Sequence, residues 1–207
     1  MHSAKLVWVT PDAEKLIGKI ARVSNPKNED NPDYEKLLKY LIKHKHWSPF
    51  EMASMCVEIT TTRAIAPQIL RHRSFSFQEF SQRYAVATAT DIPQLRRQDT
   101  KNRQNSINDL PLEDIAFCTD KIDQHFREAM DLYTYLLDKG VAKECARAVL
   151  PLNTVTRLYM SGTIRSWLHY IDLRGDNGTQ LEHMQIARSI GEILDTELPT
   201  VSRAMWS

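Results

Sequence analysis

The segment RHRSFSFQEFSQRY, which begins at Arg71, gathers side chains that could bind an anion. His72 and Arg73 follow at once, Arg83 lies near the end, and Glu79 is the one acidic residue among them. On an exposed helix face, arginine is normally balanced by a carboxylate four residues away, because such pairs stabilise the helix slightly. Because these arginines lack such balancing carboxylates, three interpretations remain: a nucleic-acid contact, a small-anion site, or a helix end whose cations face the carbonyl dipole.

Three further arginines, Arg147, Arg165 and Arg174, occur where the sequence predicts helices to begin or end. The planar guanidinium can donate two parallel hydrogen bonds to one phosphate group. Arginines from scattered segments therefore suit a mononucleotide or the diphosphate of a cofactor. Each of them could instead pair with a carboxylate or a helix C-terminus, which is common for surface charges.

Few other residues suggest chemistry. The chain has neither the GxGxxG turn that binds dinucleotides nor the GxxxxGK[ST] phosphate loop. His44 and His46 could hold a metal ion, but no HExxH motif or cysteine cluster supplies further ligands, so we expect no metal site. Both histidines could instead end a helix and contact its last carbonyl groups. The three cysteines show no CxxC spacing, which predicts neither a disulfide framework nor a zinc ribbon.

Composition restricts the class of protein. The chain has 207 residues, 42% of them hydrophobic and 26% charged, and its formal net charge is +1. A general nucleic-acid binder would be more basic, so the local basic stretch favours a small anion over a long polyanion. No apolar run approaches the ~18 residues of a membrane span, and no signal peptide is visible. We expect a cytoplasmic protein whose partners include neither nucleic acid nor membrane.

The elements that must position these side chains alternate between strands and helices in the first half of the chain. Residues 4–9 are rich in β-branched and aromatic residues and predict a strand, and so do residues 54–62. Helices are predicted over 10–23 and 31–44, because Thr10-Pro11 and Asn31-Pro32 each resemble an N-cap followed by proline at the first helical position. A third helix is predicted over 63–73, kinked by Pro67.

The second half is mostly helical. Residues 85–110 are polar and weakly patterned, which predicts a functional flap or a disordered insert. The expected elements that follow are a long helix over 111–140 capped by Gly140, a helix over 143–150, a strand over 154–162, and helices over 163–174 and 179–198. Together they predict a single helix-rich α+β domain over residues 1–207 with a small, mostly antiparallel sheet.

Four motifs in order resemble one enzyme family. RHRSFSFQEFS reads as RHR, seven residues and then Ser81, which is similar to the signature of the flavin-dependent thymidylate synthases. HWSPFE, at 46–51, resembles the family's His-x-Ser/Thr-Pro-Phe-Glu segment. ARAVLPLNTVTR at 146–157 resembles its Arg-x-x-Leu-Pro segment, and RSWLHYIDLR at 165–174 resembles its closing arginine helix.

The resemblance implies a fold and a reaction. The fold is the family's own α+β domain, not a Rossmann fold, in a homotetramer with FAD at the subunit interfaces. The reaction converts dUMP to dTMP, taking a one-carbon unit from methylenetetrahydrofolate and reducing equivalents from NADPH through FAD. No cysteine nucleophile is needed, and Cys56, Cys118 and Cys145 are expected to be small structural side chains.

The resemblance also assigns site residues. Those matching FAD-contacting positions are Ser48, Arg71, His72, Arg73, Glu79, Thr163, Ile164, Arg165 and His169. Those matching dUMP-binding positions are Gln68, Ile69, Leu70, Arg71, Glu79, Phe80, Ser81, Gln82, Arg83, Arg147 and Arg174. Arg174 is implied to be catalytic, because a guanidinium at the uracil N3 edge stabilises the ring anion that is more nucleophilic at C5. Ser81 has no adjacent base at a diagnostic spacing, so we expect it to hydrogen-bond dUMP.

Three positions depart from the family pattern. Pro67 stands where several members have arginine, Thr163 where asparagine is frequent, and Gly178 where some members have a larger polar residue near the flavin. These departures bear on FAD affinity more than on the reaction, because the arginines that match the dUMP site are all present.

Two alternative functions follow from the residues alone. A nucleic-acid-binding module using the RHR triplet predicts binding that weakens steeply with salt and no bound chromophore. A hydrolase using His44, His46 and His72 predicts stoichiometric metal in the purified protein.

Overall fold

The structure, a computed structural model, describes residues 1–206 and divides the chain into two compact units. The sheet unit comprises His2–Ile59, Gln68–Gln78 and the chain from Leu158 onward. The long-helix unit comprises Thr60–Pro67 and Glu79–Arg157, together with Met1. Ser207, the last residue of the predicted domain, lies outside the described residues.

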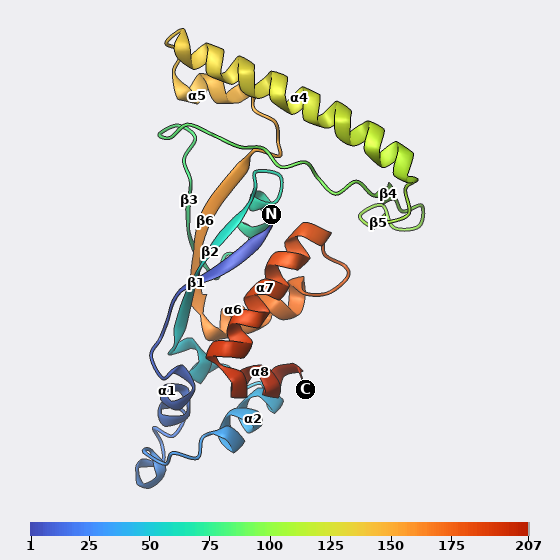
Figure 1. Cartoon of the computed structure of the whole chain (residues 1–207). Coiled ribbons are helices and arrows are strands. Elements are labelled where there is room, and N and C mark those ends of the chain that lie inside the picture. The colour runs from blue at the N-terminus through green and yellow to red at the C-terminus, as the bar shows by residue number, and fades with distance from the viewer. Residues whose placement is uncertain (207) are drawn as a thin grey trace. The chain divides into compact units, whose positions relative to one another are not determined.

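One antiparallel sheet carries the sheet unit. Its strands are β1 (Ser3–Val9), β2 (Ser54–Thr62), β6 (Val155–Thr163) and β3 (Ser76–Glu79), in the spatial order β1-β2-β6-β3 (Figure 1). The backbone N–H of Thr10, just after β1, donates to Ser54 O at the start of β2 over 2.9 Å. Ile164 N–H, just after β6, donates to Ala53 O, just before β2, over 2.9 Å. Neighbouring strands therefore run in opposite directions, which confirms the predicted small antiparallel sheet.

Helices make up the rest of this unit. They are α1 (Ala13–Ile20), α2 (Glu35–Lys43), α6 (Ile164–Arg174), α7 (Leu181–Glu197) and α8 (Pro199–Trp206), with short 3-10 turns at Pro26–Asn28 and Ser48–Glu51. Helices α6 and α7 pack on each other and α7 contacts β1, while α8 contacts α2 and α7 (Figure 1). Buried Ile186, Ile190 and Leu194 recur at spacings of four along α7 and form its core face.

The long-helix unit has a smaller core. Its elements are α4 (Leu112–Asp138), α5 (Lys143–Ala146), a 3-10 turn at Arg147–Val149, and the two-residue strands β4 (Arg97–Gln98) and β5 (Ser106–Ile107). Buried Tyr133 on α4 packs with Ala87 and Ala146, and its hydroxyl accepts a hydrogen bond from Ala87 N–H over 3.3 Å. Gly140 has φ +81° just after α4, which confirms the predicted glycine at its C-terminus.

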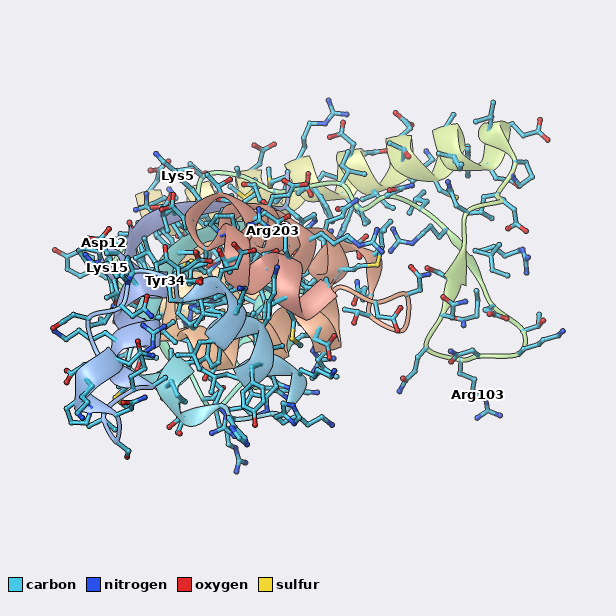
Figure 2. The ribbon with its side chains drawn as sticks, turned by 90° about the horizontal axis from the view of Figure 1, so that it is seen from below. Lys5, Asp12, Lys15, Tyr34, Arg103 and Arg203 are labelled. Carbon is cyan, nitrogen blue, oxygen red and sulfur yellow. The ribbon has the colours of Figure 1, made fainter. Side chains whose placement is uncertain are left out.

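Residues 85–110 are largely irregular. Strands β4 and β5 pair antiparallel, and Figure 2 shows Arg103 on the loop that joins them, with its side chain pointing outward. A single bridge links Thr90 to Thr154 within the same unit. A function of this segment as a flap stays a prediction.

Two predicted helix starts were wrong. Helix α1 begins at Ala13, because the Thr10 hydroxyl is used elsewhere: it donates to Ser54 O over 3.2 Å and accepts from Ser54 N–H over 2.9 Å. Helix α2 begins at Glu35, because the Asn31 side chain accepts from Asp33 N–H over 2.9 Å and forms a local turn. Both side chains hydrogen-bond to backbone groups, but neither caps a helix.

The helix predicted over 63–73 is also wrong in its length. Helix α3 spans only Ala66–Ile69, and the chain then turns through the RHR triplet into β3, a strand that we did not predict. The triplet therefore lies in a turn before a strand and not at the end of a helix. Helix α8 was not predicted either. Within residues 1–206, no helix combines the length and apolar character needed to cross a membrane.

One glycine of β6 permits an aromatic contact. A Cβ atom on Gly162 would lie 2.5 Å from the Phe75 ring, whose centroid is 4.6 Å from that of buried Trp167. We expect Gly162→Ala to destabilise the protein by about 1–3 kcal/mol, because the Phe75 ring must move. Denaturant unfolding at fixed protein concentration measures the change. Gly178→Ala is the control, since nothing lies within 4 Å of its Cβ position; equal unfolding midpoints for the two variants would contradict the expectation.

Candidate active site

The predicted site residues fall in both units. The sheet unit holds Ser48, Gln68, Ile69, Leu70, Arg71, His72, Arg73, Thr163, Ile164, Arg165, His169 and Arg174. The long-helix unit holds Glu79, Phe80, Ser81, Gln82, Arg83 and Arg147. The residues predicted to contact FAD thus lie in the sheet unit, apart from Glu79, whereas those predicted to bind dUMP are divided between the two units.

Helix α6 positions the predicted residues of the sheet unit. Thr163 is its N-cap, and its hydroxyl oxygen accepts from Ser166 N–H over 3.3 Å. The threonine that departs from the family pattern therefore has a structural role here. Arg165 and His169 lie four residues apart on one face of the helix, and Arg174 ends it.

Arg165 and His169 line a cavity of about 610 Å³. The other lining residues are Lys45, Trp47, Glu51, Ser74, Ser166, Leu168, Asp172 and Met205. Cations, hydroxyls and an indole ring are the donor set and the stacking surface that a flavin nucleotide needs, and the volume is that of a typical small-molecule site. Ser48 and Arg73, two more predicted FAD contacts, directly adjoin lining residues in the chain.

Glu51 is a residue of this cavity that our sequence reasoning missed. Its carboxylate pairs with the guanidinium of Arg165, which fixes the position of that cation at the cavity wall. The signal was present, because Glu51 is the last residue of the HWSPFE motif. Trp47 belongs to the same motif and was not assigned a role.

A second cavity, of about 410 Å³, lies in the long-helix unit. It is lined by Ser81, Arg83, Tyr84, Ala142, Lys143 and Glu144. Arg83 pairs with Glu144 over 3.0 Å, and Arg147 Nε donates to the backbone oxygen of the same glutamate over 3.4 Å. Sequence-distant residues predicted to bind dUMP are thereby brought together around Glu144, which we had not singled out.

Two other predicted dUMP residues of this unit are buried or already engaged. Gln82 is 6% exposed, and its Nε2 atom has no hydrogen-bond partner among the described residues. An unpaired buried donor fits a site built for a polar ligand. The Glu79 carboxylate contacts Arg63 at 2.5 Å and accepts from the Thr156 hydroxyl at 2.9 Å.

Other predicted residues are buried or already make a hydrogen bond. Ile69 and Ile164 are fully buried in the core. The side-chain Nε2 of Gln68 donates a hydrogen bond to Oε1 of Gln180 over 2.7 Å. Arg71, by contrast, is exposed, and its guanidinium is accessible to a ligand.

Arg174 contacts the RHR triplet directly. Its Nε atom donates a hydrogen bond to Nε2 of His72 over 3.0 Å. Burial, followed by the charge of Arg174 and the proximity of His169, lowers the pKa of His72 to about 4. Burial, Arg174 and His72 likewise lower the pKa of the fully buried His183 to about 4. Both imidazoles are therefore neutral near pH 7.

The pair suggested as metal ligands has other neighbours. The rings of His44 and Tyr40 lie 4.2 Å apart between centroids, and His46 lies 6.0 Å from the same tyrosine ring. Within residues 1–206, no group of three or more His, Cys, Asp or Glu side chains is placed to hold a metal ion.

Comparison with known proteins assigns the family. Residues 5–200 match the family described as "Thymidylate synthase complementing protein". The chain is 51% identical to a probable flavin-dependent thymidylate synthase of Paramecium bursaria Chlorella virus 1, over 98% of both chains. It is 54% identical to the flavin-dependent thymidylate synthase of Synechocystis sp., over 93% of this chain and 89% of that one. The chain belongs to this family.

A solved structure of low sequence identity has the same fold. The crystal structure of the UMP/dUMP methylase PolB from Streptomyces cacaoi, bound with 5-Br dUMP, superposes with a TM-score of 0.87 at 26% identity. The match covers 99% of this chain and 94% of that chain. The predicted α+β fold and the family resemblance are thus confirmed.

Arg165 offers a test of the larger cavity as the flavin site. We expect Arg165→Met to raise the Kd for FAD at least tenfold, about 1.4 kcal/mol, because the cavity loses a cation and leaves Glu51 without its partner. Quenching of flavin fluorescence measures the Kd. Arg127→Met is the matched control, since Arg127 is exposed on α4 and pairs only locally with Asp123. Equal Kd values for both variants and the unaltered protein would place the flavin elsewhere.

Proposed function

We propose that this chain is a flavin-dependent thymidylate synthase that methylates dUMP at C5 to give dTMP. The observation that carries the proposal is the family match over residues 5–200, together with relatives of that name at 51% and 54% identity. The dUMP methylase of the same fold supports a deoxyuridine nucleotide as the substrate. Methylenetetrahydrofolate as the one-carbon donor and NADPH as the reductant are the co-substrates that the resemblance implies.

The cavity beside α6 would hold FAD. Arg165 and Lys45 would bind its phosphate groups, and Trp47 offers an aromatic surface for one of its rings. When bound and reduced by NADPH, FAD would supply the hydride that converts the transferred one-carbon unit into a methyl group. The protein itself binds, orients and shields the reactants, which is the usual share of a flavoenzyme.

Arg174 would supply the main electrostatic contribution to the methylation. A guanidinium at the N3 edge of uracil favours loss of the N3 proton, and the resulting anion is more nucleophilic at C5. The guanidinium remains protonated, so it stabilises charge and does not act as a base. A preorganised cation of this kind is most effective where water is excluded. Arg83 and Arg147, in the long-helix unit, would bind the dUMP phosphate.

The assembly that we propose is a homotetramer with active sites at subunit interfaces, in the cytoplasm. The family resemblance implies that a neighbouring subunit completes each site. Helix α4 also presents exposed apolar side chains, Phe117, Leu132 and Tyr135 among them, which a second subunit could cover.

Turnover of the purified protein tests the proposal. With FAD, NADPH, methylenetetrahydrofolate and dUMP, we expect dTMP to form and the yellow flavin band to bleach on reduction by NADPH. Arg174→Lys keeps the charge but loses the planar guanidinium, so it should reduce dTMP formation at least tenfold, about 1.4 kcal/mol. A protein that binds no flavin in excess FAD, or forms no dTMP, contradicts the proposed function.

The cysteines give a separate test of the mechanism. Cys56 is buried in β2, where burial raises the pKa of its thiol and disfavours the reactive thiolate. Cys118 and Cys145 are exposed on α4 and α5. We expect each Cys→Ala variant to form dTMP within about tenfold of the unaltered enzyme, because the uracil anion needs no enzyme nucleophile. Turnover at saturating substrates measures this, and a loss of several thousandfold with flavin still bound would indicate a covalent cysteine mechanism.

A further inference from the structure

Arg174 differs from two other arginines of the predicted site, Arg165 and Arg83, in the kind of group that holds it. Arg165 pairs with Glu51 within the sheet unit, and in the long-helix unit Arg83 pairs with Glu144 over 3.0 Å. In each case a carboxylate compensates much of the guanidinium charge. Arg174 instead donates through Nε to the His72 imidazole over 3.0 Å. This contact fixes the arginine without adding a negative charge beside it.

The direction of that hydrogen bond defines the state of His72. A guanidinium Nε–H can only donate, so Nε2 of His72 must accept with a free lone pair. The imidazole is therefore neutral and carries its proton on Nδ1. Its low pKa, about 4, agrees with this state, because the burial and the neighbouring cation that lower the pKa also disfavour imidazolium.

Aromatic neighbours fix the orientation of the His72 ring. The Tyr170 ring stands nearly perpendicular to it, with centroids 4.9 Å apart, and the His183 ring does so at 6.1 Å. Tyr170 and His183 are fully buried and joined by a 3.1 Å hydrogen bond between the tyrosine hydroxyl and Nε2. Phe75 closes a further edge, at 6.5 Å. The ring is thus packed on several sides, which restricts its rotation.

This arrangement leaves the functional end of Arg174 available. Among residues 1–206, the bond to His72 is the one hydrogen bond that the Arg174 side chain makes. Both terminal amino groups therefore remain to donate to a ligand, in the plane that Nε has fixed. A planar guanidinium held at Nε presents those two groups in a defined direction.

We propose that His72 is a positioning residue for Arg174: its neutral imidazole, held by Tyr170 and His183, orients the guanidinium while leaving its positive charge uncompensated for the anionic uracil edge. This inference rests on the proposed function and adds to it the residue that sets the effective charge of the catalytic group. A carboxylate in the same place would orient the arginine equally well but oppose the formation of the uracil anion.

The matched substitutions His72→Gln and His72→Glu separate these two effects. The two side chains have the same shape and both remove any contact of the imidazole with the flavin. They differ in charge and in the amide donor that only Gln carries. Either can accept a hydrogen bond from Arg174 Nε. We expect kcat for dTMP formation, measured at saturating FAD for each variant, to be at least tenfold lower in His72→Glu than in His72→Gln. Equal kcat values for the two variants overturn the inference.

Ionisation of a bound nucleotide gives a readout that a merely structural role would not move. The ultraviolet spectrum of 5-fluoro-dUMP changes when its ring loses the N3 proton, so its pKa in the complex can be titrated. We expect that pKa to be lower in the unaltered enzyme and in His72→Gln than in His72→Glu. The same pKa in all three proteins contradicts the proposal, even if their activities differ.

The unaltered protein provides a test that does not depend on the variants folding. Nitrogen NMR of histidine-labelled enzyme reports the protonation of each imidazole, and we expect the Nδ1–H tautomer of His72 at pH 7. An Nε2–H tautomer or an imidazolium at that pH overturns the inference. Failure of the unaltered enzyme to form dTMP would instead contradict the proposed function, so the two failures are distinguishable.

Discussion

The hydrogen bond from Ile164 N–H to Ala53 O fixes the point at which β6 ends and α6 begins. Helix α6 then carries the side chains that matter most in the sheet unit, from Arg165 near its first turn to Arg174 at its end. Trp167 anchors the helix from within, because its indole Nε1 donates to Met55 O of β2 over 3.0 Å. A shift of this junction by one residue would rotate every side chain of α6 by about 100° and separate Arg174 from His72.

Two arginines of α6, Arg165 and Arg174, are held by partners of different charge. Arg165, predicted to bind the flavin, is held by a carboxylate, which suits a group that contacts phosphates whose charge stays constant during the reaction. Arg174, predicted to act on a charge that develops during the reaction, is held by an uncharged ring. Such a neutral support requires burial, and Tyr170 and His183 provide it. His183 is itself fully buried, and among residues 1–206 its Nδ1 has no hydrogen-bond partner.

The sequence predicts the elements whose signals are local. The strand over 54–62 and the long helix ending before Gly140 could be located from residue types alone, because β-branched runs and a C-terminal glycine act locally. The helix starts predicted at Thr10 and Asn31 were wrong, because the side chains of these residues hydrogen-bond to backbone groups that do not begin a helix. The residues of the four motifs were found because the motifs follow one another along the chain in a recognisable order. Tyr170 and His183 were not, because their role arises only from packing around His72.

Helix α4 extends for about 40 Å, at 1.5 Å per residue over 27 residues. Of these residues only Ala129 and Tyr133 are buried, both in its second half. An isolated helix of the length of the first half is marginal in water, because propagation barely offsets nucleation. The stability against local unfolding therefore differs along one continuous helix. Its second half is anchored by the core of its unit, while its first half frays unless another surface covers it.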